Sequence, residues 1–228
     1  MAISRTSVPD QVFAQLREEI LSGTYAPGER IPTQRALAAD LGVNMATVRE
    51  ALGRLEQLRL VETRHGSGTH VRDWRRSGGL DALTLLGAGA AGAEIGASLF
   101  EARRLLLAEA ARLAAERRDE AHADALGELA AAVAAAPDDA TALLADWAFM
   151  EALVEAAGNV VFQLIMNSVR ELYLPHAEAF AALVSAREEL LPRYDAVAAA
   201  VRERDGERAA AAVAELARAQ EARMAGSA

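Results

Sequence analysis

The chain has 228 residues, enough for a small domain followed by a larger one. It contains no cysteine, which excludes disulfides and cysteine-ligated metals and fits a cytoplasmic protein. All 24 of its basic residues are arginine, so neither a lysine-dependent phosphate loop nor a pyridoxal Schiff base can form.

Charge and hydropathy are unevenly distributed along the chain. Residues 1–76 carry eleven arginines against nine carboxylates, whereas residues 77–228 carry thirteen against twenty-four. We therefore expect two domains with these bounds, of which only the first meets a polyanion. No apolar run reaches the roughly 18 residues of a membrane span, so we expect no membrane contact.

Three helices are predicted in the first domain. Apolar residues recur at helical spacing over residues 8–23. Two short helices follow, with Thr33 and Asn44 as their N-caps and Gly42 in the turn between them. Two short helices joined by such a tight turn are typical of a helix-turn-helix.

A two-stranded hairpin is predicted next, with strands at residues 60–63 and 69–72. The intervening RHGSGTHV contains Ser67, but it lacks the G-x-S-x-G spacing of a hydrolase nucleophile and no helix follows it. We therefore interpret these residues as a hairpin tip. A hairpin after a helix-turn-helix makes a winged helix.

In a winged helix the second helix of the pair enters the DNA major groove with its first residues at the base edges. Asn44, Met45 and Thr47 occupy these positions. Arg49, one turn further on, can reach a phosphate or a guanine. The alternative for Arg49 is an ordinary solvated helix face.

Residues 9–72, including PGERIPTQRALAADLGVNMATVREALGRLEQLRLVETRHGSGTHV, resemble the winged-helix domain of GntR-family bacterial transcription regulators. Met45 stands where that family usually has an arginine. A methionine offers a base only apolar contact, for example with a thymine methyl, so we expect a different operator preference. The resemblance implies DNA contacts at Arg35, Asn44, Thr47 and Arg49, and a wing tip of His65 and Gly66 in the minor groove.

From about residue 80 onward the pattern is helical throughout and predicts an all-α bundle of six or seven helices. The predicted fold is therefore mainly α, a winged helix followed by a helical bundle. This order resembles the FadR-type branch of the GntR family. That resemblance implies a bundle that binds a small-molecule effector and forms a homodimer.

Many members of this branch hold a metal ion between an aspartate and three histidines. Asp146 keeps the carboxylate, but Met150 stands at the first histidine position and the other two fall at about Tyr194 and Leu216. One carboxylate alone does not make a transition-metal site. We therefore predict no metal and no other cofactor, and the alternative role of Asp146 is a paired interior carboxylate.

Parts of the bundle, including ADWAFMEALVEAAGN and LIMNSVRELY, resemble members of this branch that bind long-chain acyl-CoA. This resemblance implies that Arg103 meets the CoA portion, that Tyr173 and Tyr194 line the cavity, and that Asp146 is an effector contact. The residues alone leave two other roles for Arg103: a surface ion pair, or a bidentate contact with a small carboxylate. The effector is thus either a fatty acyl-CoA or a small organic acid bound without metal.

We predict a cytoplasmic, homodimeric regulator of transcription that binds a double-stranded DNA operator and is not an enzyme. One rival is an enzyme with an accessory winged helix. After residue 80, however, the sequence has no nucleophile next to a base, no histidine cluster and no paired carboxylates at fixed spacing. Another rival, a purely structural protein, would require a vestigial winged helix.

Overall fold

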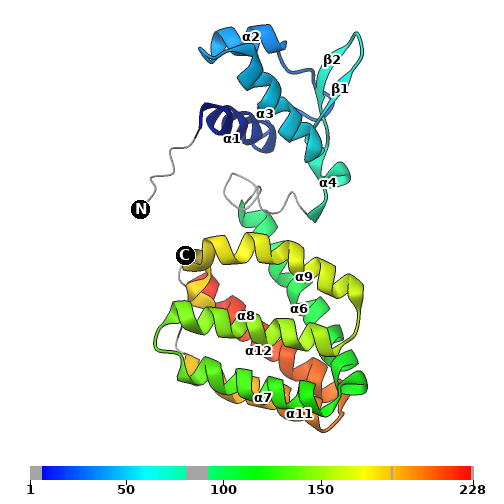
Figure 1. The fold of residues 1–228 in the computed structure, drawn as a ribbon, viewed down its shortest axis with the longest axis vertical. Coiled ribbons are helices and arrows are strands. Elements are labelled where there is room, and N and C mark those ends of the chain that lie inside the picture. Colours follow the sequence, from blue (N-terminus) through cyan, green and yellow to red (C-terminus); the bar gives the residue numbers. More distant parts are fainter. Residues whose placement is uncertain (1–6, 81–91, 186, 227–228) are drawn as a thin grey trace. The chain divides into compact units, whose positions relative to one another are not determined.

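The computed structural model describes residues 7–80, 92–185 and 187–226 (Figure 1). The chain divides into two compact units, Met1–Ile95 and Gly96–Ala228. We call them the N-terminal unit and the helical unit and describe each by itself. None of the helices in the described ranges is long and apolar enough to cross a membrane.

The N-terminal unit has the predicted winged-helix order of elements, three helices followed by an antiparallel hairpin. A short unpredicted helix follows the hairpin. The elements are α1 Val8–Leu21, α2 Gln34–Asp40, α3 Met45–Gln57, β1 Val61–Arg64, β2 Gly68–Val71 and α4 Trp74–Ser77.

Polar side chains fix where the three helices begin. Ser7 and Asp10 form a reciprocal capping box at the start of α1. The predicted caps of α2 and α3 are confirmed, because Thr33 and Asn44 each accept a hydrogen bond from the backbone N–H three residues on. Gly42 has φ +65°, so the turn between α2 and α3 uses the left-handed backbone that glycine adopts most easily.

A small apolar core, supplied by all three helices, the loop before α2 and the hairpin, holds the N-terminal unit together. At its edge the Arg54 guanidinium on α3 lies 4.1 Å from the centre of the Phe13 ring and donates to Asp10 at 2.7 Å. These two contacts join α1 to α3. They fix the position of the helix whose first turn is predicted to meet DNA.

The hairpin pairs Val61 with Val71 and Arg64 with Gly68. Gly66 and Gly68 at its tip both have positive φ, +73° and +93°. The strand β2 also bridges to Arg30 in the loop before α2, so the hairpin is anchored at its base.

The helical unit contains seven α-helices within the described residues, which confirms the predicted all-α bundle. They are α6 Gly92–Arg117, α7 Glu120–Ala135, α8 Asp139–Ala156, α9 Val160–Tyr173, α10 Ala177–Phe180, α11 Leu191–Arg202 and α12 Gly206–Gly226. Short 3-10 turns at Leu174–His176, Ala181–Val184 and Arg187–Glu189 connect α9 to α11. This stretch is the least regular described part of the bundle.

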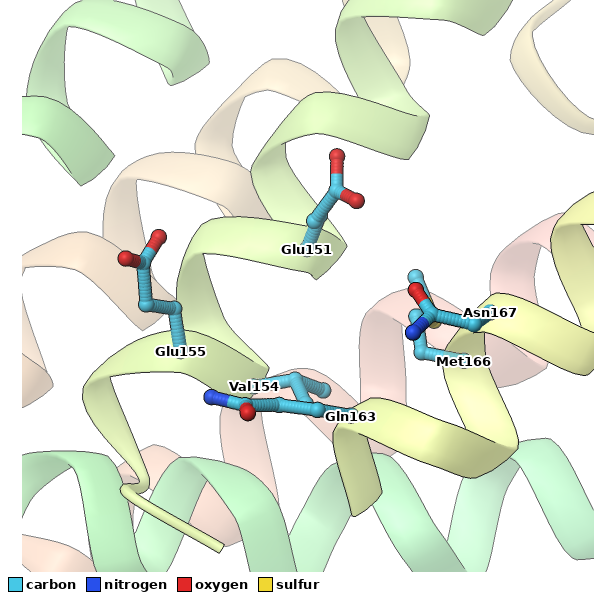
Figure 2. A pocket seen from close by; sticks show the side chains of 6 residues that line it. All are labelled: Glu151, Val154, Glu155, Gln163, Met166 and Asn167. Atoms are coloured by element: carbon cyan, nitrogen blue, oxygen red, sulfur yellow. The ribbon is translucent and has the colours of Figure 1, made fainter. Parts of the chain in front are cut away.

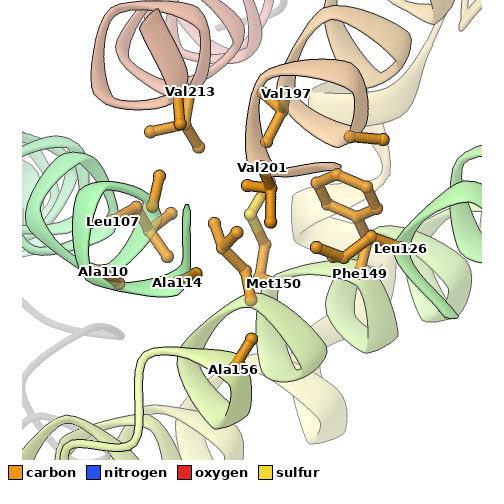
Figure 3. Close-up of a cluster of buried hydrophobic side chains, with 14 of the residues drawn as sticks. Leu107, Ala110, Ala114, Leu126, Phe149, Met150, Ala156, Val197, Val201 and Val213 are labelled. Atoms are coloured by element: carbon orange, nitrogen blue, oxygen red, sulfur yellow. The ribbon is translucent and has the colours of Figure 1, made fainter. Parts of the chain in front are cut away.

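The main core of the helical unit is almost wholly apolar (Figure 3). The small residues Ala110 and Ala114 of α6 and the larger Phe149 and Met150 of α8 belong to this core. Val201 of α11 fills the space between these helices (Figure 3). A second, more aromatic cluster lies around Trp147 and borders the polar site described below.

Candidate functional site

The residues that were predicted to read DNA lie on α2 and at the start of α3, and all of them except Thr47 are exposed. Asn44 is exposed and also caps the helix, and Met45 keeps 45% of its surface exposed. Thr47 is buried, and its hydroxyl donates to Asn44 at 3.2 Å. Arg35 and Arg49 are exposed, and neither makes an ion pair with any described residue. Their guanidinium groups are available to phosphates or base edges.

At the tip of the wing, His65 and Gly66 are exposed, as a groove contact requires. Ser67 contacts His70: its hydroxyl lies 2.9 Å from Nε2, and the other ring nitrogen lies 3.3 Å from the Gly28 carbonyl oxygen. These contacts tie the tip to the loop before α2. Ser67 thus has a structural role: it helps to hold the wing in position.

A second site lies inside the helical unit, where side chains of four helices converge on Asp146 of α8. This carboxylate is 1% exposed. Tyr194 donates to its Oδ1 at 2.5 Å, and Gln220 Nε2 donates to the same oxygen at 2.8 Å. Tyr173 reaches Oδ2 at 3.4 Å, so every partner of the carboxylate so far is a neutral donor.

Arg103 of α6 supplies the positive charge of this network. Its Nη2 donates to the Gln220 carbonyl at 2.7 Å and lies 3.9 Å from Asp146 Oδ2. The Arg103 side chain is 19% exposed, so it keeps some access to solvent. A buried carboxylate with this many donors and a nearby cation is fully satisfied, and removal of one partner is costly.

The two tyrosines remain protonated over a wide pH range. Burial raises the pKa of Tyr173 and of Tyr194 well above the usual value, and the Asp146 charge raises both further. Both hydroxyls therefore act as donors to Asp146 at neutral pH. The donors and the one cation of the site serve the Asp146 carboxylate, so an anionic ligand of Arg103 would compete with Asp146 for them.

The structure brings together all four residues predicted for the effector site: Arg103, Asp146, Tyr173 and Tyr194. Among the described residues, the carboxylate nearest to Arg103 is the buried Asp146, not a surface glutamate. Gln220 was missed by the sequence analysis, which placed the last family histidine position at about Leu216. Leu216 is buried in the main core, whereas Gln220, one helical turn further on, contacts Asp146. Only the register of α12 distinguishes these two residues, and the sequence alone does not fix it.

The network also has the wrong chemistry for a transition metal. Its members around Asp146 are phenols, a carboxamide and a guanidinium, which are poor or impossible ligands for such an ion. Nowhere in the described ranges do three His, Asp or Glu side chains form a group that could hold a metal ion.

A cavity of about 290 Å³ lies elsewhere in the helical unit, between α8 and α9 (Figure 2). Glu151 and Glu155 rise from α8, Gln163 and Asn167 lie on α9, and Met166 contributes an apolar wall. Glu151 is neutralised by Arg170 at 2.7 Å. With two carboxylates in its lining, this groove is a poor site for an anion.

Comparison with known families matches each unit separately. Residues 9–71 match the model described as "Bacterial regulatory proteins, gntR family". Residues 98–219, more than half of the chain, match the FCD domain, the C-terminal domain of FadR-type regulators.

Relatives cover most of the chain. The HTH-type transcriptional regulator Mce2R of Mycobacterium tuberculosis is 36% identical over 201 residues, which is 87% of this chain and 84% of that protein. LutR of Bacillus subtilis is 35% identical over 68% of this chain and 70% of its own. The fold is similar to that of Lar from Listeria monocytogenes, with a TM-score of 0.59, 17% identity and coverage of 98% and 99% of the two chains. The protein therefore belongs to the GntR family of bacterial transcription regulators, in the branch that carries an FCD effector-binding domain.

Proposed function

We propose that two copies of the chain read a pseudo-palindromic operator and that a small organic acid, bound at Arg103, changes their affinity for DNA. Each copy places α3 in the major groove and the tip of its wing in the minor groove. The two copies can adopt one arrangement that fits the operator and another that does not, and the effector binds one of these more tightly than the other. Its influence on DNA binding cannot exceed that difference.

The unpaired arginines of the N-terminal unit support the DNA-binding surface. Arg35 and Arg49 are exposed and without a carboxylate partner in the described structure, whereas Arg54 and Arg64 are held by acids within the unit. Phosphate contacts from such free cations provide most of the salt-dependent affinity for DNA. Asn44, Met45, His65 and Gly66 complete the proposed contact surface, and the buried Thr47 supports it through its hydrogen bond to Asn44.

The observation that carries the effector proposal is Arg103 within a largely buried set of hydrogen-bond donors. A ligand carboxylate can bind a guanidinium through two parallel hydrogen bonds. Here it competes with Gln220, which accepts from Arg103 at 2.7 Å, and with Asp146 at 3.9 Å. Arg103 thus supplies the positive charge that a metal ion supplies in other members of the branch.

A small acid suits this site better than an acyl-CoA. The CoA portion carries several phosphates, but Arg103 is the one guanidinium in the network described here. A ligand of that size also needs a cavity near the upper end of the roughly 300–1,000 Å³ range of ligand pockets. The cavity of about 290 Å³ between α8 and α9 lies outside the Arg103 network and is lined by two glutamates, so it offers no cation to these phosphates.

The test is fluorescence anisotropy with DNA from beside the protein's own gene, at one fixed salt concentration, with and without a panel of organic acids and a long-chain acyl-CoA. We expect an organic acid to change the DNA affinity of the wild type but not of Arg103→Gln. Arg104→Gln is the matched control, since Arg104 is the next residue on α6 and belongs to no contact in the network. A response to acyl-CoA alone, or an equal loss of response in both variants, would contradict the proposed effector site.

A further inference from the structure

The indole N–H of Trp147 is buried without a hydrogen-bond partner. Trp147 is 7% exposed, and its Nε1 atom has neither solvent nor an acceptor within reach in the described structure. The Nε atoms of Arg17 and Arg170 share this property, but a guanidinium has other N–H donors, and Arg170 forms an ion pair with Glu151 through Nη2. An indole has a single N–H, so Trp147 has no alternative donor.

The Trp147 ring belongs to a row of aromatic rings. The Trp147 and Tyr173 rings lie 5.1 Å apart with an interplanar angle of 34°, and Tyr173 stacks on Phe180 at 4.9 Å and 28°. The rest of the cluster is aliphatic or small, apart from Phe100 and two methionines at its border. Such surroundings leave the N–H unpaired, a state that native proteins usually avoid and that calls for an explanation.

The aromatic cluster adjoins the Arg103 network. The Tyr173 hydroxyl lies 3.4 Å from Asp146 Oδ2, while its ring packs against Trp147. On α6, Phe100 precedes Arg103 by three residues, and on α12, Met224 follows Gln220 by four. Residues at these spacings share one face of a helix. Residues of α6, α9 and α12 thus belong both to the Arg103 network and to the aromatic cluster that contains Trp147.

We propose that the effector is an aromatic carboxylate with a second hydrogen-bond acceptor, and that this acceptor takes the N–H of Trp147. Its carboxylate binds Arg103, and its ring joins the stack of Trp147 and Tyr173. Phe180 is the half-buried outer member of that stack and lies on the four-residue helix α10, so it is the ring that gives way. This inference rests on the proposed function and specifies the chemistry of its ligand.

A saturated acyl chain does not meet these requirements. It would fill the apolar space but leave the Trp147 N–H unpaired, as it is now. A buried donor that stays unsatisfied makes a site discriminate strongly against ligands without the matching acceptor. A planar ring also makes better contact with rings tilted by only 28° and 34° than a flexible chain does.

The experiment follows the indole N–H resonances of the full chain labelled with ¹⁵N-tryptophan. The sequence has two tryptophans, Trp74 and Trp147, so a Trp74→Phe variant assigns the signal. The probes are 3- and 4-acetylbenzoate, which carry an acceptor, and 3- and 4-isopropylbenzoate, which are close to them in size but lack it. Decanoate represents the acyl chain.

We expect one acetylbenzoate to shift the Trp147 signal downfield and to bind at least about 10-fold more tightly than its isopropyl partner, a difference of about 1.4 kcal/mol. The conservative variant Trp147→Phe should bind both members of the pair with similar affinity. Equal affinities in the wild type, tighter binding of decanoate, or no saturable binding of any benzoate at millimolar concentration would overturn the proposal.

Anisotropy with operator DNA separates this inference from the proposed function. If a probe shifts the Trp147 signal but leaves DNA affinity unchanged, the ligand site is supported and the regulation by an acid at Arg103 is wrong. If another acid changes DNA affinity through Arg103 while the Trp147 signal stays in place, the regulation is supported and the assigned ligand class is wrong.

Discussion

Replacement of Tyr194 by phenylalanine tests the hydrogen-bond network around Asp146 at its strongest point. The Tyr194 side chain is 0% exposed, donates to Asp146 at 2.5 Å and accepts from Gln220 at 2.9 Å. The phenylalanine ring keeps the edge-on contact with Phe149 at 5.2 Å. The variant therefore removes one hydroxyl and leaves the packing in place.

The expected loss of stability follows from the hydrogen bond that the substitution removes. A hydrogen bond to a charged acceptor contributes about 1.5–3 kcal/mol, and we expect Tyr194→Phe to lower the free energy of unfolding by about 2 kcal/mol. Tyr173→Phe is the matched control, because it deletes the same group at 3.4 Å from the same carboxylate. Its longer, weaker bond predicts a loss below about 1 kcal/mol.

Urea unfolding measures both losses. The fluorescence of Trp147 in a Trp74→Phe background reports on the helical unit, to which Trp147 belongs. An equal loss in the two variants, or a larger one for Tyr173→Phe, would refute the assignment of Tyr194 as the principal donor to Asp146.

Three further outcomes are expected. The folded chain keeps the protons of Tyr173 and Tyr194 where the unfolded chain loses them, so the free energy of unfolding should fall as the pH rises past about 10; a flat urea midpoint from pH 9 to 11 would contradict the raised pKa values. The purified protein should contain no stoichiometric metal by mass spectrometry, and a bound equivalent that responds to Asp146→Ala would disprove the metal-free site. Met45 should contact a thymine methyl: replacement of single operator thymines by uracil should weaken wild-type binding by about 1 kcal/mol or less at one position and leave Met45→Ala unaffected, whereas equal losses would argue against this contact.

The sequence predicted the N-terminal unit in most of its detail. Thr33 and Asn44 cap their helices through hydrogen bonds to residues three positions further along the chain. The two glycines at the wing tip lie where the backbone has positive φ. Such local physics can be derived from short stretches of sequence. The short helix α4 was missed because four residues give no periodicity.

The effector site depends on contacts between distant segments, and prediction was less complete there. Arg103, Asp146, Tyr173 and Tyr194 were proposed through family resemblance, and the structure brings them together. Gln220 lies 74 residues from Asp146 in the sequence, and no local pattern connects the two. The unpaired N–H of Trp147 likewise arises from tertiary packing and has no signature in the sequence.

This arrangement explains in physical terms how the site can do without the histidines that bind a metal ion in other members of the branch. Asp146 is close to one guanidinium and accepts hydrogen bonds from two phenols and a carboxamide, so its charge is compensated within the chain. A transition metal would have to displace these donors and would gain a single strong ligand. We therefore expect the domain to fold and to bind its effector without metal.

The measurement that tests the central claim most directly is anisotropy of the wild type, Arg49→Ala and Arg193→Ala with DNA from beside the protein's own gene, over a range of salt concentrations. Arg193 of the helical unit controls for the loss of one positive charge. We predict sequence-specific binding by the wild type and by Arg193→Ala, and weaker binding by Arg49→Ala with a salt dependence reduced by about one phosphate contact. Absence of specific binding by the wild type, or identical affinities of the two variants, would contradict the account.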